Sequence, residues 1–295
     1  MIVITGATGQ IGSKVVEELS AGAEPVRVIV RDPARLPERI RDRVEVVQGS
    51  LEDPDVLAKA YAGADAVFWL SPPNAGAASI DGYMLGLART TCAAIAAQGV
   101  GHVVGVSSLG RGSALAAHAG QITAALAVDD LIAATGAHYR ALCMPGFMEN
   151  TLTQVAPIRG QGMVVGLVPG DLKLPSCATR DIAAVAAGLL RDRTWTGRGD
   201  VAVLGPEDLS NDDMARVMSE VLGRPVRYQR AEPEAYAAML TGHGMTAAWA
   251  QGLVDMSDAV SRGLYADAVR TPDSGTHTTF RQWCEEVLKP AVEAN

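Results

Sequence analysis

The sequence predicts an α/β protein built on a doubly wound parallel sheet, with a smaller α/β lobe toward the C-terminus. Three observations support this fold class. Apolar runs of strand length alternate with segments of helical periodicity through the first half of the chain. A glycine-rich turn joins the first strand to the first helix. The run at residues 64–70 is almost continuously apolar, as expected for a central parallel strand covered on both faces.

The first strand and the first helix flank three glycines at G-x-x-G-x-x-G spacing. Gly6 allows a tight turn, Gly9 lets a pyrophosphate approach the backbone, and Gly12 lets the helix pack on the strand. Glycine triples also arise by chance in a chain with 31 glycines. The strand at 1–5, the helix after the turn and a second strand at 25–30 favour a dinucleotide site instead. The predicted contacts are Gly6, Thr8, Gly9, Gln10, Ile11 and Gly12.

Composition narrows the class of protein. With 295 residues and 48% hydrophobic content, the chain can bury a large core. No segment approaches ~20 uninterrupted apolar residues, so no membrane span is expected. The first strand begins at Met1, which leaves no room for a signal peptide, and we expect a cytoplasmic location. A net charge of -8 opposes nucleic-acid binding. We therefore expect a small-molecule substrate, bound by a monomer or a homodimer.

Cysteine and histidine spacing argues against a metal centre. The four cysteines form no C-x-x-C pair, and the five histidines show no H-x-x-x-H spacing. We expect reduced cysteines and no metal.

The residues after the second strand indicate which dinucleotide the site would take. Arg31 directly follows this strand, and Arg35 lies close enough to assist it. A guanidinium clamps a 2′-phosphate through two hydrogen bonds, whereas an acid at this place binds the ribose hydroxyls and repels that phosphate. Arg31 therefore favours NADP(H) over NAD(H). The alternative is that Arg31 is a solvated surface charge and that Asp32 holds the ribose.

Further cofactor contacts are expected where later strands end, because ligands of open parallel sheets lie at the carboxyl ends of the strands. The strands predicted at 44–48, 64–70, 102–107 and 138–143 each run into turn residues. Phe147 is one of only three phenylalanines, and we expect it beside the nicotinamide or substrate, or in the core. The predicted contacts in these turns are Ser50, Leu51, Ser71, Pro72, Ser107, Pro145, Gly146 and Phe147.

The boundary between two lobes is expected near residue 150. Residues 1–150 are predicted to form the dinucleotide-binding domain, and residues 151–295 mainly a substrate-binding lobe. Glycines and prolines after this point break the chain into short strands. A helix and a strand within 176–204 are expected to return to the large sheet. No flexible linker separates the lobes, so we expect them to pack tightly.

Helices are predicted from apolar periodicity and from their end signals. Gly99 and Gly136 end two of them, and Ser210 caps another whose first turn carries two acids. After the first helix, the predicted helices span residues 54–62, 80–98, 121–135, 180–191, 210–222, 234–240, 245–262 and 278–288.

Several of these stretches together resemble the NmrA-like family, an atypical branch of the short-chain dehydrogenase/reductase superfamily. The resemblance implies a Rossmann-type domain that binds NADP(H) and a C-terminal lobe that closes over the nicotinamide. Members of the family are NAD(P)H-dependent reductases, including quinone reductases, or redox-sensing regulators without turnover. The matching stretches are Gly6 to Gly12, Val30 to Pro33, Gly49 to Asp53, Met144 to Asn150, Thr179 to Ala184 and Leu209 to Asp213.

This sequence departs from its relatives at the usual catalytic pair. The superfamily's Tyr-x-x-x-Lys occurs nowhere in the chain. Many NmrA-like reductases keep a lysine early in the helix before the sixth strand, and Ala125 lies close to that position. Lys59 and Lys173 are the nearest lysines, in the wrong segments. Hydride transfer to a quinone remains compatible with this loss, because holding the ring against the nicotinamide supplies much of the rate.

The candidate proton donors are Tyr83, Ser107, Ser108 and His118. The alternative for each is a position without a catalytic role, such as a turn or ribose contact for a serine and an exposed surface position for His118. An adaptable apolar substrate pocket is predicted from Met148, Met163, Met239, Met245 and Trp249, which could equally be core residues.

Three functions are compatible with these observations. The favoured one is an NADPH-dependent oxidoreductase that transfers hydride to a small apolar acceptor such as a quinone or enone. The second is a regulator that senses NADP(H) without turnover, and the third is a biosynthetic enzyme that uses the same cleft for non-redox chemistry. The fold alone does not decide between them.

Overall fold

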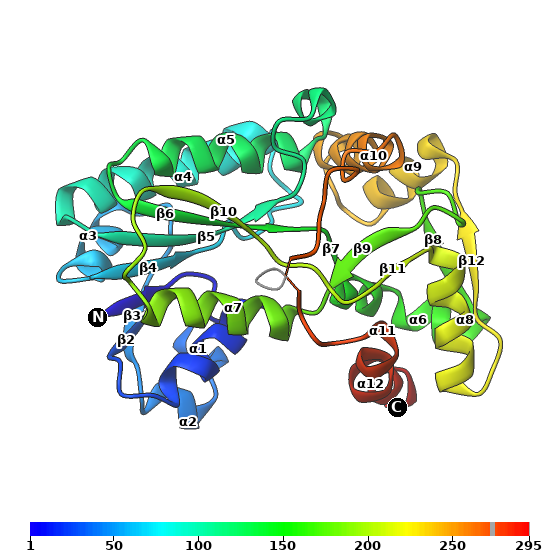
Figure 1. The fold of residues 1–295 in the computed structure, drawn as a ribbon, viewed down its shortest axis with the longest axis horizontal. Helices are drawn as coiled ribbons and strands as arrows, with labels where there is room; N and C mark the ends of the chain where they lie inside the picture. Colours follow the sequence, from blue (N-terminus) through cyan, green and yellow to red (C-terminus); the bar gives the residue numbers. More distant parts are fainter. Residues whose placement is uncertain (272–274, 295) are drawn as a thin grey trace.

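Seven parallel strands form the larger sheet, in the order β10-β6-β5-β4-β1-β2-β3 (Figure 1). The computed structural model describes residues 1–271 and 275–294. Each neighbouring pair in this sheet is parallel, so the carboxyl ends of the strands share one edge. The strands are β1 (Ile2–Ile4), β2 (Val26–Val30), β3 (Glu45–Gln48), β4 (Ala66–Trp69), β5 (His102–Ser108), β6 (His138–Met144) and β10 (Arg198–Ala202).

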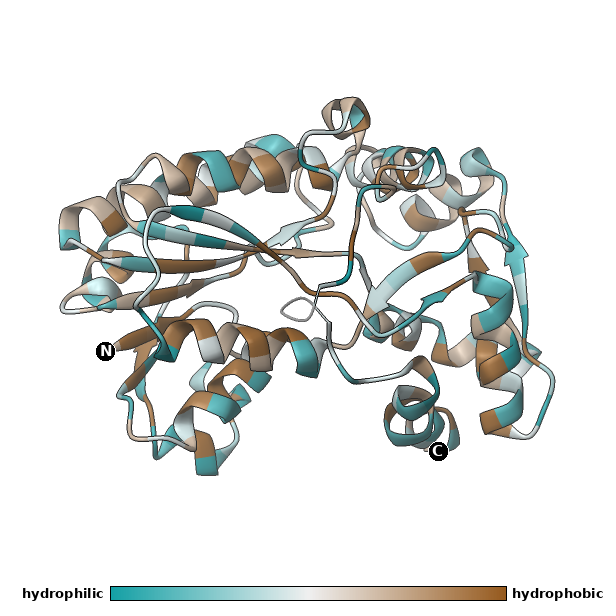
Figure 2. Cartoon of the chain, viewed as in Figure 1, coloured by the Kyte–Doolittle hydropathy of each residue, from teal (hydrophilic) through white to brown (hydrophobic). Residues whose placement is uncertain are grey.

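Helices cover both faces of this sheet (Figure 1). One layer contains α1, α2 and α7, and the other contains α3, α4 and α5. Successive strand residues point to opposite faces, so Ile2 and Ile4 join one core cluster while Val3 joins the other. Figure 2 shows hydrophobic colour along several of these strands and, alternating with hydrophilic colour, on the helices beside them. The helices are α1 (Gly12–Ser20), α2 (Glu38–Arg41), α3 (Pro54–Tyr61), α4 (Ile80–Gln98), α5 (Gln121–Ala133) and α7 (Thr179–Arg191).

The doubly wound parallel sheet confirms the predicted fold class. The end of α4 is also confirmed, because Gly99 adopts a left-handed φ of 67° and its N–H bonds the carbonyls of Ala96 and Ile95. The chain returns to the sheet after entering the second lobe. There α7 packs on α1, and β10 pairs with β6.

The second lobe contains two small sheets and a set of helices at the carboxyl edge of the large sheet (Figure 1). One sheet joins β7 (Gly146–Phe147), β9 (Leu174–Cys177) and β11 (Asp208–Leu209), and the other joins β8 (Met163–Gly166) to β12 (Arg227–Arg230). The α-helices are α6 (Val155–Gln161), α8 (Asn211–Leu222), α9 (Pro233–Gly242), α10 (Ala247–Ser261), α11 (Phe280–Trp283) and α12 (Lys289–Glu293). Short helical turns are η1 (Pro33–Arg35), η2 (Ala114–His118), η3 (Met148–Gln154) and the π-helical η4 (Cys284–Leu288).

Two helical segments of this lobe differ from the sequence prediction. Helix α6 forms where glycines and prolines predicted only short strands. Tertiary contacts explain it, because Ile158 is fully buried and the Arg159 guanidinium donates to the carbonyls of Val292 and Ala291. The last helical segment also runs beyond residue 288, through the π-helical turn into α12, and this continuation buries Val292.

Among the described residues, no helix is both long and apolar enough to span a membrane. The four cysteines are free; Cys143, Cys177 and Cys284 are buried and Cys92 is half-buried.

The cap of α8 offers a test of the second lobe. The Ser210 hydroxyl accepts a hydrogen bond from the Asp213 N–H at 3.0 Å, and the Asp213 carboxylate accepts one from the Ser210 N–H at 3.3 Å. Ser210→Ala should lower the free energy of unfolding by about 1 kcal/mol in urea denaturation. Ser20→Ala, at an exposed helix end, is the control and should stay within about 0.5 kcal/mol of the native protein. Equal effects of both variants would contradict the capping role.

Candidate functional site

The glycine turn is shaped by two close approaches within the protein. Gly6 has a φ of 65°, and a Cβ there would lie 2.7 Å from the Leu70 side chain. A Cβ on Gly12 would lie 2.2 Å from the Gly6 carbonyl oxygen. A Cβ on Gly9 would meet only that oxygen, at 3.3 Å. Protein packing therefore requires glycine at two of the three positions and leaves the space over Gly9 open except for this one close contact with the Gly6 carbonyl oxygen.

The N-terminus of α1 has no side-chain cap. Its N-cap residue is Ile11, whose side chain is buried, and its first turn carries no acid. Helices α4 and α8, by contrast, are capped by Ser79 and Ser210. Free N–H groups at a positive helix end form an anion-binding site. Together with the open space over Gly9, they fit the pyrophosphate of a dinucleotide.

The two arginines after β2 are free to bind an anion. Arg31 and Arg35 are exposed, and their guanidinium groups form no ion pair with any described residue. Asp32 is engaged, because its carboxylate accepts a hydrogen bond from the Ala34 N–H at 3.0 Å and caps η1. Both interpretations of this strand end therefore stay predictions: a 2′-phosphate bound by Arg31, or a ribose bound by Asp32.

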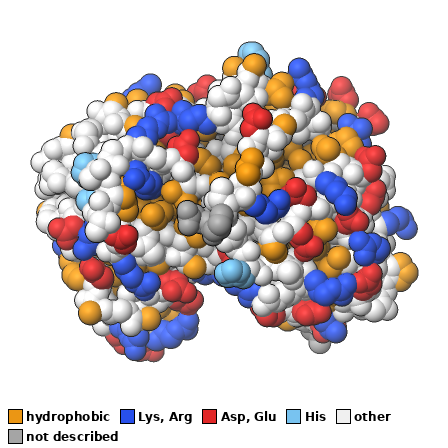
Figure 3. Space-filling view, in the orientation of Figure 1, with side chains coloured by type: hydrophobic (Ala, Val, Ile, Leu, Met, Phe, Trp, Pro, Cys, Tyr) orange, Lys and Arg blue, Asp and Glu red, His pale blue; other side chains and the backbone are white. Residues whose placement is uncertain are grey.

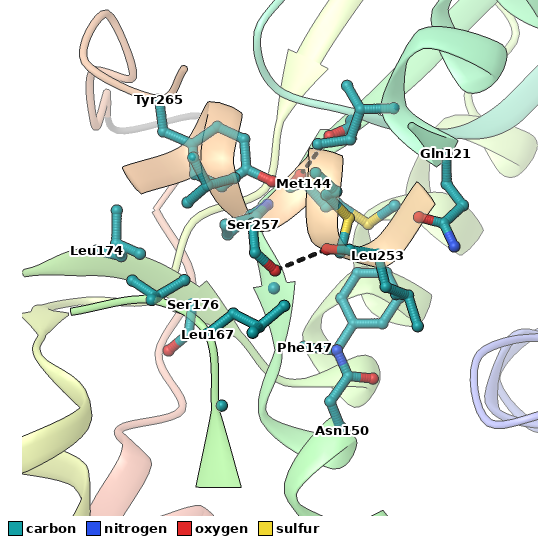
Figure 4. Close-up of a pocket in the computed structure, with 18 of the residues that line it drawn as sticks. Gln121, Met144, Phe147, Asn150, Leu167, Leu174, Ser176, Leu253, Ser257 and Tyr265 are labelled. Atoms are coloured by element: carbon teal, nitrogen blue, oxygen red, sulfur yellow. Dashed lines mark hydrogen bonds between the residues drawn. The ribbon is translucent and has the colours of Figure 1, made fainter. Parts of the chain in front are cut away.

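A cavity of about 570 Å³ lies at the carboxyl ends of β4, β5 and β6, between the large sheet and the second lobe. Its floor includes Ser71, Ser107 and Ser108, and the β6–β7 turn adds Pro145 to Phe147. Helices α5 and α10 line one side and strands β8 and β9 another (Figure 4). The structure thus brings together six of the residues predicted from the strand ends.

Ser107 is committed to a buried carboxylate. Its hydroxyl donates to Asp129 at 2.5 Å, and the Tyr139 hydroxyl donates to the same carboxylate at 2.7 Å. Arg111 forms an ion pair with Asp129 at 2.9 Å. Burial raises the pKa of the Asp129 carboxyl, and the hydrogen bonds from Ser107, Tyr139 and Arg111 oppose that shift. The Ser107 hydroxyl proton is thus directed to Asp129 and not into the cavity, where the sequence analysis expected a proton donor.

Tyr265 is a cavity residue that the sequence analysis missed. It lies after α10 and lines the cavity near Ser108. Burial raises the pKa of the Tyr265 phenol, and a hydrogen bond with Ser108 opposes the shift. A tyrosine so far along the chain from any motif carries no local signal, and only the packing of the two lobes brings it to the strand ends.

Two predicted proton donors lie outside this cavity. Tyr83 packs edge-on against Trp249, with ring centroids 6.4 Å apart. Burial and the charge of Glu52 raise the pKa of Tyr83, and Arg31 opposes them, which places its phenol near the arginine that follows β2. His118 is exposed in η2 and lines a separate surface groove. Neither position supports proton transfer in the cavity.

The methionines that face the cavity also differ from those predicted. Met148 is buried in the core of the second lobe, and Met239 is 44% exposed. Met163, Met245 and Trp249 do not line the cavity either. The lining methionines are Met84, Met144, Met214 and Met256. Helical spacing shows which residues share a face, but not whether that face meets core, solvent or a cavity.

The remaining predicted contacts lie in the turns around the glycine loop. The Ser50 hydroxyl accepts a hydrogen bond from the Glu52 N–H at 3.2 Å, and Leu51 packs partly on the core. Gln10 is exposed. Thr8 and Pro72 are half-buried. The described residues contain no group of three or more His, Cys, Asp or Glu side chains able to hold a metal ion.

The fold and the glycine turn define a dinucleotide-binding α/β protein. A family model described as NAD(P)H-binding matches residues 6–193, and the chain belongs to that family. Its fold is of the NmrA-like, atypical short-chain dehydrogenase/reductase type, as the sequence predicted.

Full-length relatives support this assignment. The chain is 33% identical over 292 residues to the (4-alkanoyl-5-oxo-2,5-dihydrofuran-3-yl)methyl phosphate reductase of Streptomyces griseus, covering 97% of both chains. It is 32% identical over 288 residues to the NAD(P)H azoreductase of Xenophilus azovorans, covering 97% of this chain and 96% of that protein. The NADPH complex of the Escherichia coli quinone oxidoreductase QOR2 superposes with a TM-score of 0.81 at 25% identity, covering 98% and 100% of the two chains.

The different constraints on two of the glycines can be separated by substitution. Gly12→Ala should destabilise the fold, because its methyl group collides with backbone. Gly9→Ala should lower the thermal midpoint much less than Gly12→Ala and weaken NADPH binding at least tenfold, measured by nicotinamide fluorescence, because its methyl group enters the space proposed for the pyrophosphate. Gly86→Ala, where a Cβ meets nothing within 4 Å, is the control. Native affinity in Gly9→Ala would contradict this placement of the pyrophosphate.

Proposed function

We propose that this chain is an NADPH-dependent oxidoreductase that transfers hydride to a small apolar acceptor such as a quinone or an enone, without a Tyr-Lys pair. One observation carries the proposal: a largely apolar cavity begins at the carboxyl ends of β4, β5 and β6, beside the glycine turn. This is where ligands of doubly wound sheets bind. The reductase names of the relatives support the same class of reaction.

The proposed cofactor contacts follow the strand ends in order. Amide groups at the start of α1 hold the pyrophosphate beside Gly9, and Arg31 holds the 2′-phosphate with help from Arg35. The turn at Ser50 and Leu51 lies beside the adenine. The segments at 71–72 and 145–147 bracket the nicotinamide ribose and ring. Bound there, the reduced nicotinamide supplies the hydride.

The residues of the chain then position the acceptor and keep water out. The Ser107 hydroxyl donates its proton to Asp129. Its oxygen can therefore accept a hydrogen bond from a donor group of the ligand, such as an amide or a ribose hydroxyl, and orient that group. The phenol of Tyr265 keeps its proton at neutral pH, since burial raises its pKa, and it replaces Tyr83 and His118 as the candidate donor to the reduced oxygen. The apolar walls favour stacking of a planar ring over hydration.

Cofactor preference tests the role of Arg31. Arg31→Ala removes a charge-assisted contact worth about 1.5–3 kcal/mol, so NADPH should bind about tenfold to a hundredfold more weakly while NADH changes little. Titration of both nucleotides by fluorescence measures the change. Arg39→Ala is the matched control, because Arg39 is exposed and paired with Glu17. Equal loss for NADPH and NADH would contradict 2′-phosphate recognition by Arg31.

Turnover tests the proposed reaction itself. Purified protein should oxidise NADPH, followed at the nicotinamide absorbance band, when a panel of quinones and enones is added. Binding of NADPH without consumption by any acceptor would overturn the reductase proposal. It would favour a sensor or a non-redox enzyme.

A further inference from the structure

The described residues in the wall of this cavity carry no charged side chain. Among the described residues that line it, there is no Asp, Glu, Lys, Arg or His. The chain as a whole carries 33 acidic and 25 basic residues besides its histidines. On the face shown in Figure 3, apolar side chains gather near the middle of the molecule, with charged side chains around them. The cavity is therefore an uncharged region in a highly charged protein.

The charged residues next to the wall are directed elsewhere. Lys173 stands between two lining leucines but is exposed. Arg230 is exposed, and its guanidinium donates to the Leu167 carbonyl at 2.9 Å. Asp129, beneath Ser107, is neutralised by Arg111. No counter-charge thus reaches into the cavity from these neighbours.

Several polar side chains of the wall are used by the protein itself. The Gln154 amide both donates to the Val165 carbonyl at 2.9 Å and accepts from the Val165 N–H at 2.7 Å. The Tyr228 hydroxyl donates to the Val168 carbonyl at 2.6 Å. These groups shape the wall and have little capacity left for a ligand.

Gln121 is different, because its carboxamide forms no hydrogen bond with any described residue. Its side-chain oxygen is buried and unpartnered. Gln121 begins α5 and lines the cavity on the side away from Leu174 and Ser176 of β9 (Figure 4). A buried oxygen without a partner costs free energy, so its presence in a cavity wall indicates a ligand that donates a hydrogen bond to it.

The position of Gln121 also suits the acceptor rather than the dinucleotide. It lies two turns before Asp129 on α5, about 12 Å along the helix axis at 1.5 Å per residue. Ser107, the residue bound to Asp129, marks the strand end where the nicotinamide is proposed to lie. Ala125 lies between them and lines the cavity without adding a charge.

From the uncharged wall and the free amide, and resting on the proposed function, we propose that this cavity selects an uncharged acceptor. It excludes phosphate-, sulfonate- and carboxylate-bearing substrates, and the Gln121 side-chain oxygen accepts a hydrogen bond from the hydroxyl group formed when the acceptor is reduced. An anion placed here would lose its hydration without gaining a counter-ion. The chain would then differ in specificity from its Streptomyces griseus relative, which is named for a phosphate-bearing substrate.

Equilibrium binding of a matched pair of quinones tests the selection. We would titrate the native protein, saturated with NADP⁺ to prevent turnover, with 2-methyl-1,4-naphthoquinone and with 1,4-naphthoquinone-2-sulfonate by isothermal calorimetry. The sulfonate should bind at least a hundredfold more weakly. Equal or tighter binding of the sulfonate would overturn the proposal, as would failure of both quinones to bind. Because binding needs no hydride transfer, these outcomes are distinct from a failure of NADPH oxidation.

A cation introduced into the wall should reverse the selection. Ala125→Lys places an ammonium group in the cavity. The dissociation constant of the sulfonate, divided by that of the uncharged quinone, should then fall at least tenfold. If the variant binds NADP⁺ normally and this ratio is unchanged, the lack of a positive charge in the wall is not what excludes anionic acceptors.

The role of Gln121 has a separate test. Gln121→Leu keeps the approximate size and removes the accepting oxygen, so 2-methyl-1,4-naphthohydroquinone, titrated without oxygen, should bind about threefold to tenfold more weakly, with the dissociation constant of NADPH unchanged. Gln98→Leu, at the exposed end of α4, is the control. Unchanged hydroquinone binding, or an equal loss of NADPH binding, would overturn the assignment.

Discussion

The approach of the first helix to the first turn is the constraint on which the rest of the structure depends. Gly12 lies so close to the Gly6 carbonyl that a side chain has no room, and Gly6 adopts a backbone conformation that L side chains rarely take. This contact directs an uncapped helix N-terminus toward the carboxyl end of β1. Thr5 then joins β1 to β4 by accepting a hydrogen bond from the Leu70 N–H at 2.8 Å. Because the sheet is parallel, the later strand ends meet at the same edge and form the floor of one cavity.

The second lobe adds further walls to the cavity at that edge. The β6–β7 turn leads the chain directly from the large sheet to the cavity wall. Helix α10 of the second lobe packs on α5, and both helices line the cavity. The Ser107 hydroxyl and the Tyr139 hydroxyl each donate a hydrogen bond to the Asp129 carboxylate. This network fixes the orientation of the Ser107 hydroxyl at the edge of the cavity. The wall itself is uncharged among its described residues. The site that we propose therefore combines a charged nucleotide end, at Arg31, with a neutral acceptor end.

The parts of this arrangement that could be predicted from sequence are local. Strand runs, glycine turns and helix ends such as Gly99 depend on a few neighbouring residues, and the strand ends follow from the parallel topology. The orientation of side chains between the lobes depends on tertiary packing instead. For this reason Tyr265 and Gln121 were missed, while Tyr83 and His118 were expected in a cavity that they do not line. Helix α6 was missed for a similar reason, because long-range contacts outweigh its proline and glycine.

The central claim is that an acceptor in the cavity takes hydride from NADPH bound at the glycine turn. The most direct measurement is a single turnover without oxygen, in which protein saturated with one equivalent of NADPH is mixed with excess 2-methyl-1,4-naphthoquinone. The account predicts that the nicotinamide absorbance disappears in one phase and that one equivalent of hydroquinone forms. It also predicts a slower phase when the transferred hydrogen is replaced by deuterium. Persistence of the nicotinamide absorbance while NADPH and quinone are both bound would contradict the account.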